Sequence, residues 1–210
     1  MNPLRLTLLR RVVFVLAAVP FARLFVLGYL GDLTANPVEF VTRSLGTWCL
    51  VMLCLTLAIT PLRRLTGAAW WLRLRRMLGL WAFFYGSVHL LTYVWFDQWF
   101  DVAAIWDDVV KRPFIAAGFV SWLLMVPLAF TSNQWAMRRL GRRWSVLHRL
   151  IYLLAPVGVL HFWWHKSAKN DLFEPMIYAA VIGLLLAMRL LWRWRRSMNG
   201  PLRSKDQEAA

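Results

Sequence analysis

A chain of 210 residues in which 60% of the side chains are hydrophobic is too apolar for an ordinary soluble domain, where about half of the residues are apolar. Its formal net charge of +15 would favour nucleic-acid binding in a soluble protein, but the arginines form short runs between long apolar segments rather than one continuous basic surface. We therefore expect an all-α integral membrane protein that is surrounded by membrane lipids and binds no nucleic acid.

Six apolar segments have the length that a bilayer core requires of a helix, about 20 residues. In chain order they are residues 11–30, 45–60, 77–96, 114–131, 145–164 and 175–192. The first begins like a signal peptide but continues without a small-x-small cleavage site, so we interpret it as a retained helix. The second is short and ends at Thr60-Pro61. No internal repeat is evident, and residues 1–210 are expected to form a single six-helix bundle.

The charges around these segments predict their orientation, because Lys and Arg are retained on the cytoplasmic side of a membrane. Seventeen of them lie on one side, in the N-terminus, the second and fourth loops and the tail. The other side has five, which are Arg43, Lys111, Arg112, Lys166 and Lys169. All acidic residues except Asp206 and Glu208 lie on this second side. Both termini are therefore expected in the cytoplasm.

Two histidines lie at similar depths in the third and fifth segments, which run in the same direction. His89 precedes Asp97 by eight residues and His161 precedes Lys166 by five. At 1.5 Å per residue, these spacings place the imidazoles roughly 12 and 8 Å below the outer loops. Two neutral imidazoles at one depth on facing helices can ligate a haem iron from both sides. The spacing therefore predicts a haem between His89 and His161.

Small residues beside His89 favour this interpretation. Gly79, Ala82 and Gly86 give the third segment a small face, and a flat macrocycle needs such clearance. The alternative is that each histidine only hydrogen-bonds a neighbouring helix, as polar side chains within membrane spans often do.

The remaining histidine of the fifth segment, His148, lies 13 residues before His161, which is about 20 Å closer to the cytoplasm. At that depth the third segment offers Arg75 and Arg76 and no histidine. Three interpretations stay open. His148 binds a second haem without an ordinary second ligand, lines a quinone or flavin pocket with Arg75, Arg76 and Arg149, or makes a purely structural polar contact.

Two stretches also resemble a known family. "RRMLGLWAFFYGSVHLLTYVWFDQ" (75–98) and "LGRRWSVLHRLIYLLAPVGVLHFWWHKS" (140–167) are similar to the membrane haem subunits of bacterial periplasmic methionine sulfoxide reductase systems, and the likeness covers essentially the whole chain. Those subunits belong to the wider ferric reductase-like transmembrane group. The resemblance implies a cytochrome b-like protein of the bacterial inner membrane that carries haem b and is associated with FMN. It also implies electron transfer from quinol to a periplasmic molybdenum-cofactor subunit, which reduces methionine sulfoxide in oxidised proteins.

Carried over by position, His89 and His161 correspond to the haem ligands of this family and His148 to its additional histidine. The wider group usually has a second histidine on the third helix, where this chain has Arg75 and Arg76. The resemblance thus implies one haem b, or two if His148 binds a second. No motif assigns residues to FMN.

The chain has no glycine-rich dinucleotide fingerprint, so we expect an electron-transfer subunit rather than an enzyme that oxidises NAD(P)H by itself. Two other functions stay open. One is a cytochrome b that serves a different periplasmic acceptor. The other is a colourless transporter that uses its intramembrane histidines as proton or metal sites.

Overall fold

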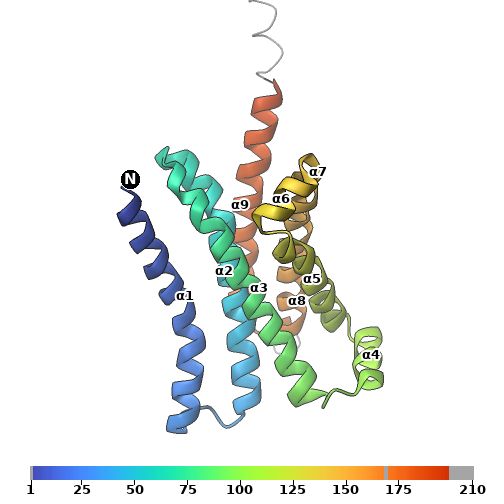
Figure 1. The fold of residues 1–210 in the computed structure, drawn as a ribbon. Coiled ribbons are helices and arrows are strands. Elements are labelled where there is room, and N and C mark those ends of the chain that lie inside the picture. The colour runs from blue at the N-terminus through green and yellow to red at the C-terminus, as the bar shows by residue number, and fades with distance from the viewer. Residues whose placement is uncertain (1, 168–169, 199–210) are drawn as a thin grey trace, which may run out of the picture.

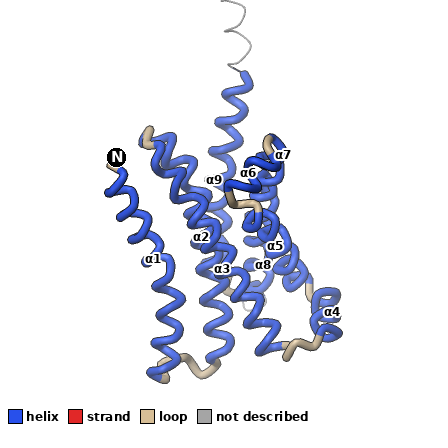
Figure 2. Tube along the Cα trace, in the orientation of Figure 1, coloured by secondary structure: helices blue, strands red, loops and turns tan. Residues whose placement is uncertain are grey.

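The computed structural model describes residues 2–167 and 170–198, and this part of the chain consists of helices joined by short connections (Figures 1 and 2). Six segments within it are long and apolar enough to cross a membrane. They are Pro3–Leu30, Pro37–Thr66, Ala69–Asp97, Pro113–Phe130, Arg142–Ser167 and Phe173–Arg195. The protein is therefore all-helical with six candidate membrane spans. Some of the charged residues used above to predict orientation lie outside the described residues, namely Lys169, Arg203, Lys205, Asp206 and Glu208.

The individual helices have the following bounds. The six long ones are α1 (Pro3–Leu30), α2 (Pro37–Thr66), α3 (Leu72–Thr92), α5 (Pro113–Phe130), α8 (Ile151–Ser167) and α9 (Phe173–Met198). A π-helical turn, Tyr93–Asp97, extends α3, and α7 (Arg142–Leu147) with a 3-10 turn (His148–Leu150) leads into α8. The short α4 (Val102–Lys111) and α6 (Gln134–Leu140) lie in the connections around α5.

Cap residues explain where the first two helices begin and end. The side chain of Asn2 accepts a hydrogen bond from the Leu4 N–H, and that of Asn36 accepts one from the Glu39 N–H. A proline follows each of these asparagines, where the missing N–H costs nothing. Gly31 and Gly67 end α1 and α2 with φ of 74° and 68°, a left-handed conformation that favours glycine.

The helix α2 continues past the expected end at residue 60, and Arg189 of α9 explains how. Pro61 has no N–H, so the carbonyl of Leu57, four residues earlier, lacks its usual helical donor. The Arg189 guanidinium supplies the missing hydrogen bond, with Nη2 2.6 Å from the Leu57 oxygen and 3.2 Å from Thr60 Oγ1. The helix therefore passes through the proline to Thr66.

The core lies where α2 and α3 pack together and where α8 and α9 pack against α2. Its most buried side chains include Leu45, Leu57, Tyr85 and Ala155. Two glycines of the small face of α3 lie against α2 in this core. A Cβ on Gly86 would lie 3.2 Å from Cys49 Sγ, and one on Gly79 would lie 3.7 Å from the Thr56 methyl group, both on α2.

The ends of the helices separate the charges as expected. The N-terminus, the α2–α3 connection, α6, α7 and the end of α9 share one end of the bundle (Figure 1). The α1–α2 connection and α4 lie at the opposite end, where the described acidic residues are concentrated. The described part of the bundle therefore has one arginine-rich end and one acidic end.

Candidate functional site

The imidazoles of His89 on α3 and His161 on α8 face each other inside the bundle. Their ring centroids are 6.1 Å apart and the ring planes are inclined by 71°. Both residues are only partly exposed. The two histidines that the sequence singles out by depth are thus brought together.

Each imidazole of this pair is held from behind by a backbone carbonyl of a neighbouring helix. His89 Nδ1 lies 2.8 Å from the Thr42 oxygen on α2, and His161 Nδ1 lies 2.6 Å from the Phe114 oxygen on α5. A carbonyl can only accept, so each Nδ1 carries the proton and donates it. In the neutral imidazole, Nε2 is then the unprotonated nitrogen of each ring.

A glycine allows each imidazole to approach its carbonyl. Gly46 follows Thr42 by four residues and Gly118 follows Phe114 by four, so each glycine lies one helical turn beyond the accepting carbonyl. A Cβ at Gly46 would lie 3.1 Å from His89 Cε1, and a Cβ at Gly118 would lie 2.9 Å from His161 Cε1 and Nδ1. Any larger residue would occupy space that the imidazole needs.

The two halves of this site are equivalent. The hydrogen bond from each histidine spans 47 residues of chain, and each histidine follows its glycine by 43 residues (89 minus 46 and 161 minus 118). The pair α2–α3 therefore positions His89 in the same way as the pair α5–α8 positions His161. The sequence shows no repeated motif at the two halves. The residues that support the histidines, which are Thr42, Gly46, Phe114 and Gly118, were not predicted from the sequence. The equal glycine-to-histidine spacing is the signal that could have revealed them.

This arrangement suits a metal ion between the rings. Nδ1–H bonded to a carbonyl fixes ring orientation and leaves Nε2 as the ligand, which is how metal-bound histidines are usually held. Two imidazoles on opposite sides of one metal, with nitrogen–metal bonds of about 2 Å, have ring centres roughly 6 Å apart. The observed separation of 6.1 Å fits that requirement. No cluster of three or more His, Cys, Asp or Glu that could hold a metal occurs among the described residues.

His148 differs from the pair because its Nε2 is already engaged. That nitrogen lies 3.0 Å from Thr131 Oγ1, and the Thr131 hydroxyl donates its own proton to the Pro127 carbonyl at 2.6 Å. Thr131 can therefore only accept from His148, which must carry a proton on Nε2. The ring also stacks on Trp144, with centroids 4.0 Å apart. These contacts tie the His148 ring to Thr131 and Trp144.

The three arginines expected around His148 do not converge. Arg75 lies within electrostatic range of His148 and of Tyr152, inside the bundle. Arg76 instead points to the other side of α3, where it lines a cleft next to α1. Arg149 is exposed. Of the pocket suggested by the sequence, only Arg75 and His148 are neighbours.

Comparison with known proteins agrees with the resemblance noted from the two histidine stretches. Residues 45–159 match the family described as the ferric reductase like transmembrane component. The chain is 56% identical over 188 residues to the protein-methionine-sulfoxide reductase heme-binding subunit MsrQ of Bordetella parapertussis, covering 90% of this chain and 91% of that protein. It is 53% identical over 201 residues to the MsrQ subunit of Ralstonia nicotianae, covering 95% and 93%. The MsrQ subunit of Rhodospirillum rubrum is 53% identical over 171 residues, which cover 81% of each chain. No solved structure matches significantly.

Proposed function

Because this chain belongs to the MsrQ family within the ferric reductase-like transmembrane components, we propose that it is the haem-binding membrane subunit of a protein-methionine-sulfoxide reductase system, with His89 and His161 as the axial ligands of one b-type haem. The observation that carries this proposal is the facing histidine pair. Both rings are tied through Nδ1 to a carbonyl, and their centroids are 6.1 Å apart. These residues fit a haem iron between them.

The chain contributes position and electrostatics to this cofactor, whose iron supplies one-electron transfer when bound. The Thr42 and Phe114 carbonyls hold the histidines in the tautomer that leaves Nε2 free, and they increase the basicity of both ligands. Gly46 and Gly118 keep space for the rings. His148 is not a ligand on this proposal, so the chain holds a single haem.

The proposed electron donor, electron acceptor and flavin rest on the family resemblance and on the distribution of charged residues between the two ends of the bundle. If the arginine-rich end faces the cytoplasm across a bacterial inner membrane, His89 lies eight residues, about two helical turns, below the periplasmic end of its helix at Asp97. That position suits delivery of electrons to a periplasmic catalytic subunit that reduces methionine sulfoxide. Quinol is the proposed donor. FMN is proposed on the resemblance alone, and Arg75, a partly buried basic group next to His148 and Tyr152, is best placed to hold its phosphate.

The ligand assignment is tested by absorption and electron paramagnetic resonance spectra of the purified protein. We expect a low-spin b-type spectrum with one haem per chain by pyridine haemochrome assay. His89→Ala and His161→Ala should each remove most of the haem. His165→Ala is the control, since His165 lies on the same helix near Phe114 and beyond the pair. A colourless wild-type protein, or full haem content in both ligand variants, would overturn the proposal.

The electron-transfer path is tested by stopped-flow absorbance of the protein in membranes. Quinol should reduce the haem without NAD(P)H, and the periplasmic reductase with a methionine sulfoxide substrate should reoxidise it. If quinol does not reduce the haem, quinol is not the donor, and another donor such as a cytosolic flavin reductase takes its place. Failure of reoxidation would reject the proposed partner.

A further inference from the structure

A cleft between α1 and α3 opens near the arginine-rich end of the bundle, on the side away from His148. Its volume is about 560 Å³, within the range of sites that hold small molecules. The N-terminal part of α1 lies apart from α2 and α3 in Figure 1. The lining residues are Arg10, Phe14, Arg73, Arg76, Met77, Leu80, Trp81 and Phe84.

Three arginines line this cleft, and none of them has a counter-ion among the described residues. Arg10 comes from α1, and Arg73 and Arg76 come from the first turns of α3. All three are exposed, and none makes an ion pair or a hydrogen bond within the described part of the chain. The described residues contain no Asp or Glu at this end of the bundle, so none of them neutralises these charges. The cleft is thus electrostatically suited to an anion.

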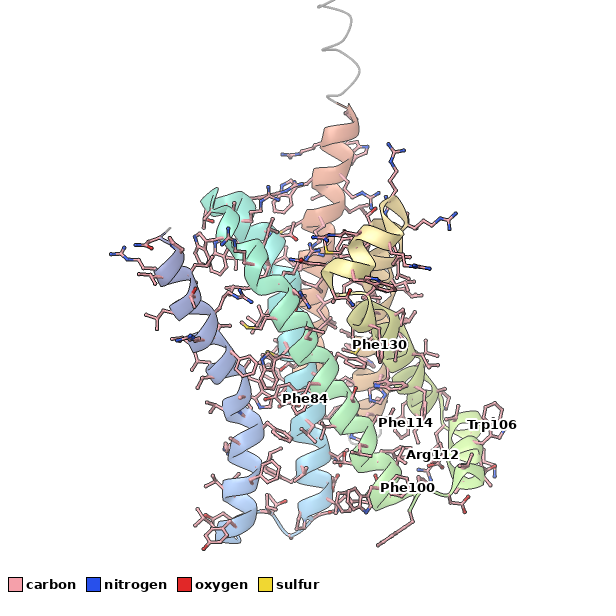
Figure 3. All side chains as sticks on the ribbon, viewed as in Figure 1. Phe84, Phe100, Trp106, Arg112, Phe114 and Phe130 are labelled. Atoms are coloured by element: carbon pink, nitrogen blue, oxygen red, sulfur yellow. The ribbon has the colours of Figure 1, made fainter. Side chains whose placement is uncertain are left out.

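The rest of the cleft is apolar and reaches into the membrane-spanning part of both helices. Phe14 of α1 and Trp81 of α3 are in contact within it, with ring centroids 5.2 Å apart. Phe84, which lies between α1 and α3 in Figure 3, packs against Phe21 at 5.0 Å. Phe14 and Leu80 are 53% and 37% exposed, and both lie in helices long and apolar enough to cross a membrane. An occupant must therefore be anionic at one end and apolar along the rest.

We propose that this cleft binds an anionic phospholipid of the cytoplasmic leaflet, with its phosphate held by Arg10, Arg73 and Arg76 and an acyl chain against Phe14, Leu80 and Phe84. Basic pockets between membrane helices on the cytoplasmic side hold acidic headgroups in this manner. The lipid fills the gap beside α1 and joins that peripheral helix to α3. The site is separate from the histidine pair and does not depend on haem.

The test uses native mass spectrometry of the full-length protein, released from bacterial membranes in a neutral detergent and then titrated with single lipids. Phosphatidylglycerol should remain bound in preference to phosphatidylcholine, which has the same chains and no net charge. Arg10→Gln, Arg73→Gln and Arg76→Gln together should weaken phosphatidylglycerol binding by about fivefold for each arginine removed. Leu80→Trp fills the apolar part without changing the charge, and it should weaken binding of the lipid while all three arginines remain.

The matched control is Arg138→Gln, Arg142→Gln and Arg143→Gln, which removes three exposed arginines from the same end of the bundle but outside the cleft. This control should keep the preference for phosphatidylglycerol, and haem content should be unchanged in every variant that folds. An equal loss of phosphatidylglycerol binding in both triple variants would mean that binding depends only on the overall charge of this end. That result would overturn the proposed site. Equal retention of the two lipids, or recovery of a flavin mononucleotide in place of a lipid, would also overturn it.

Discussion

The imidazole of His161 lies so close to Gly118 that a methyl group on this glycine would be 2.9 Å from Cε1 and Nδ1 of the ring. We predict that Gly118→Ala displaces the imidazole, breaks its hydrogen bond to Phe114 and removes more than half of the haem. Gly46→Ala should have a smaller effect on His89, since its Cβ would lie 3.1 Å from the ring. Haem per chain and the low-spin electron paramagnetic resonance signal measure both effects.

Gly183→Ala on α9 is the control, because nothing lies within 4 Å of a Cβ at that position. In a helix interior, alanine is more favourable than glycine by about 1 kcal/mol, so this change should leave stability equal or slightly higher. Since alanine should strengthen the helix, a loss of haem in Gly118→Ala cannot come from a weaker helix and identifies a clash between the new methyl group and His161. Normal haem content and an unchanged spectrum in Gly118→Ala would contradict the prediction.

The position of a residue along a helix axis can be predicted from the sequence, because residues can be counted. The direction in which its side chain points around that axis is harder to predict. The counting of residues from the outer loops correctly brought His89 and His161 to one level, because the rise per residue hardly varies. The same counting could not identify the groups that accept hydrogen bonds from the two imidazoles. Thr42 and Phe114 contribute backbone carbonyls, which any residue type has, so their identity carried no signal. The glycines carry a signal, but only once their partners are known.

The arginines next to His148 illustrate the second limit. Arg75 and Arg76 are adjacent in sequence, and adjacent residues of a helix point about 100° apart. The sequence grouped them at one depth, yet one faces the bundle interior near His148 and the other faces α1. A membrane helix that is apolar around its whole circumference gives no amphipathic pattern from which to choose.

His148 tests the single-haem proposal. His148→Ala should retain haem at the wild-type ratio, because its Nε2–H is used by Thr131. The variant should lose thermal stability equivalent to about 1 kcal/mol, the usual value of one hydrogen bond. Thr131→Val should resemble it, and the double variant should lose little more than either single one. Haem loss in His148→Ala, or a second haem per wild-type chain, would show that His148 is a ligand.

Asp108 holds the short helix α4 against the end of α3. Its carboxylate accepts hydrogen bonds from Tyr93 Oη at 3.0 Å and Gln98 Nε2 at 2.7 Å, and it pairs with Arg112 Nε at 3.2 Å. We predict that Asp108→Ala accelerates chymotrypsin cleavage in this connection about tenfold, since local opening becomes easier. The connection presents exposed aromatic residues to the protease, among them Phe100 and Trp106 (Figure 3).

Asp107→Ala is the matched control, because Asp107 makes one exposed ion pair with Lys111, a contact of little energetic value. Cleavage should occur in spheroplasts, where only the periplasmic side is accessible, and this outcome also tests the orientation. Faster cleavage in both variants would mean that Asp108 has no special role. Cleavage only in inside-out vesicles would reverse the predicted topology.

We predict that the hydrogen bond from Arg189 to the Leu57 carbonyl contributes to thermal stability because Pro61 leaves this carbonyl without a helical donor. Arg189→Met keeps most of the side-chain volume but leaves a buried carbonyl unsatisfied, which costs about 1–3 kcal/mol. In a Pro61→Ala background, the new N–H of residue 61 can satisfy Leu57 within α2. The loss of Tm caused by Arg189→Met should then be at most half as large, whereas two independent sites would give additive losses. Thermal unfolding of the four proteins in one detergent measures this coupling. Strict additivity would show that Arg189 stabilises α9 by some contact other than the one that allows α2 to pass through its proline.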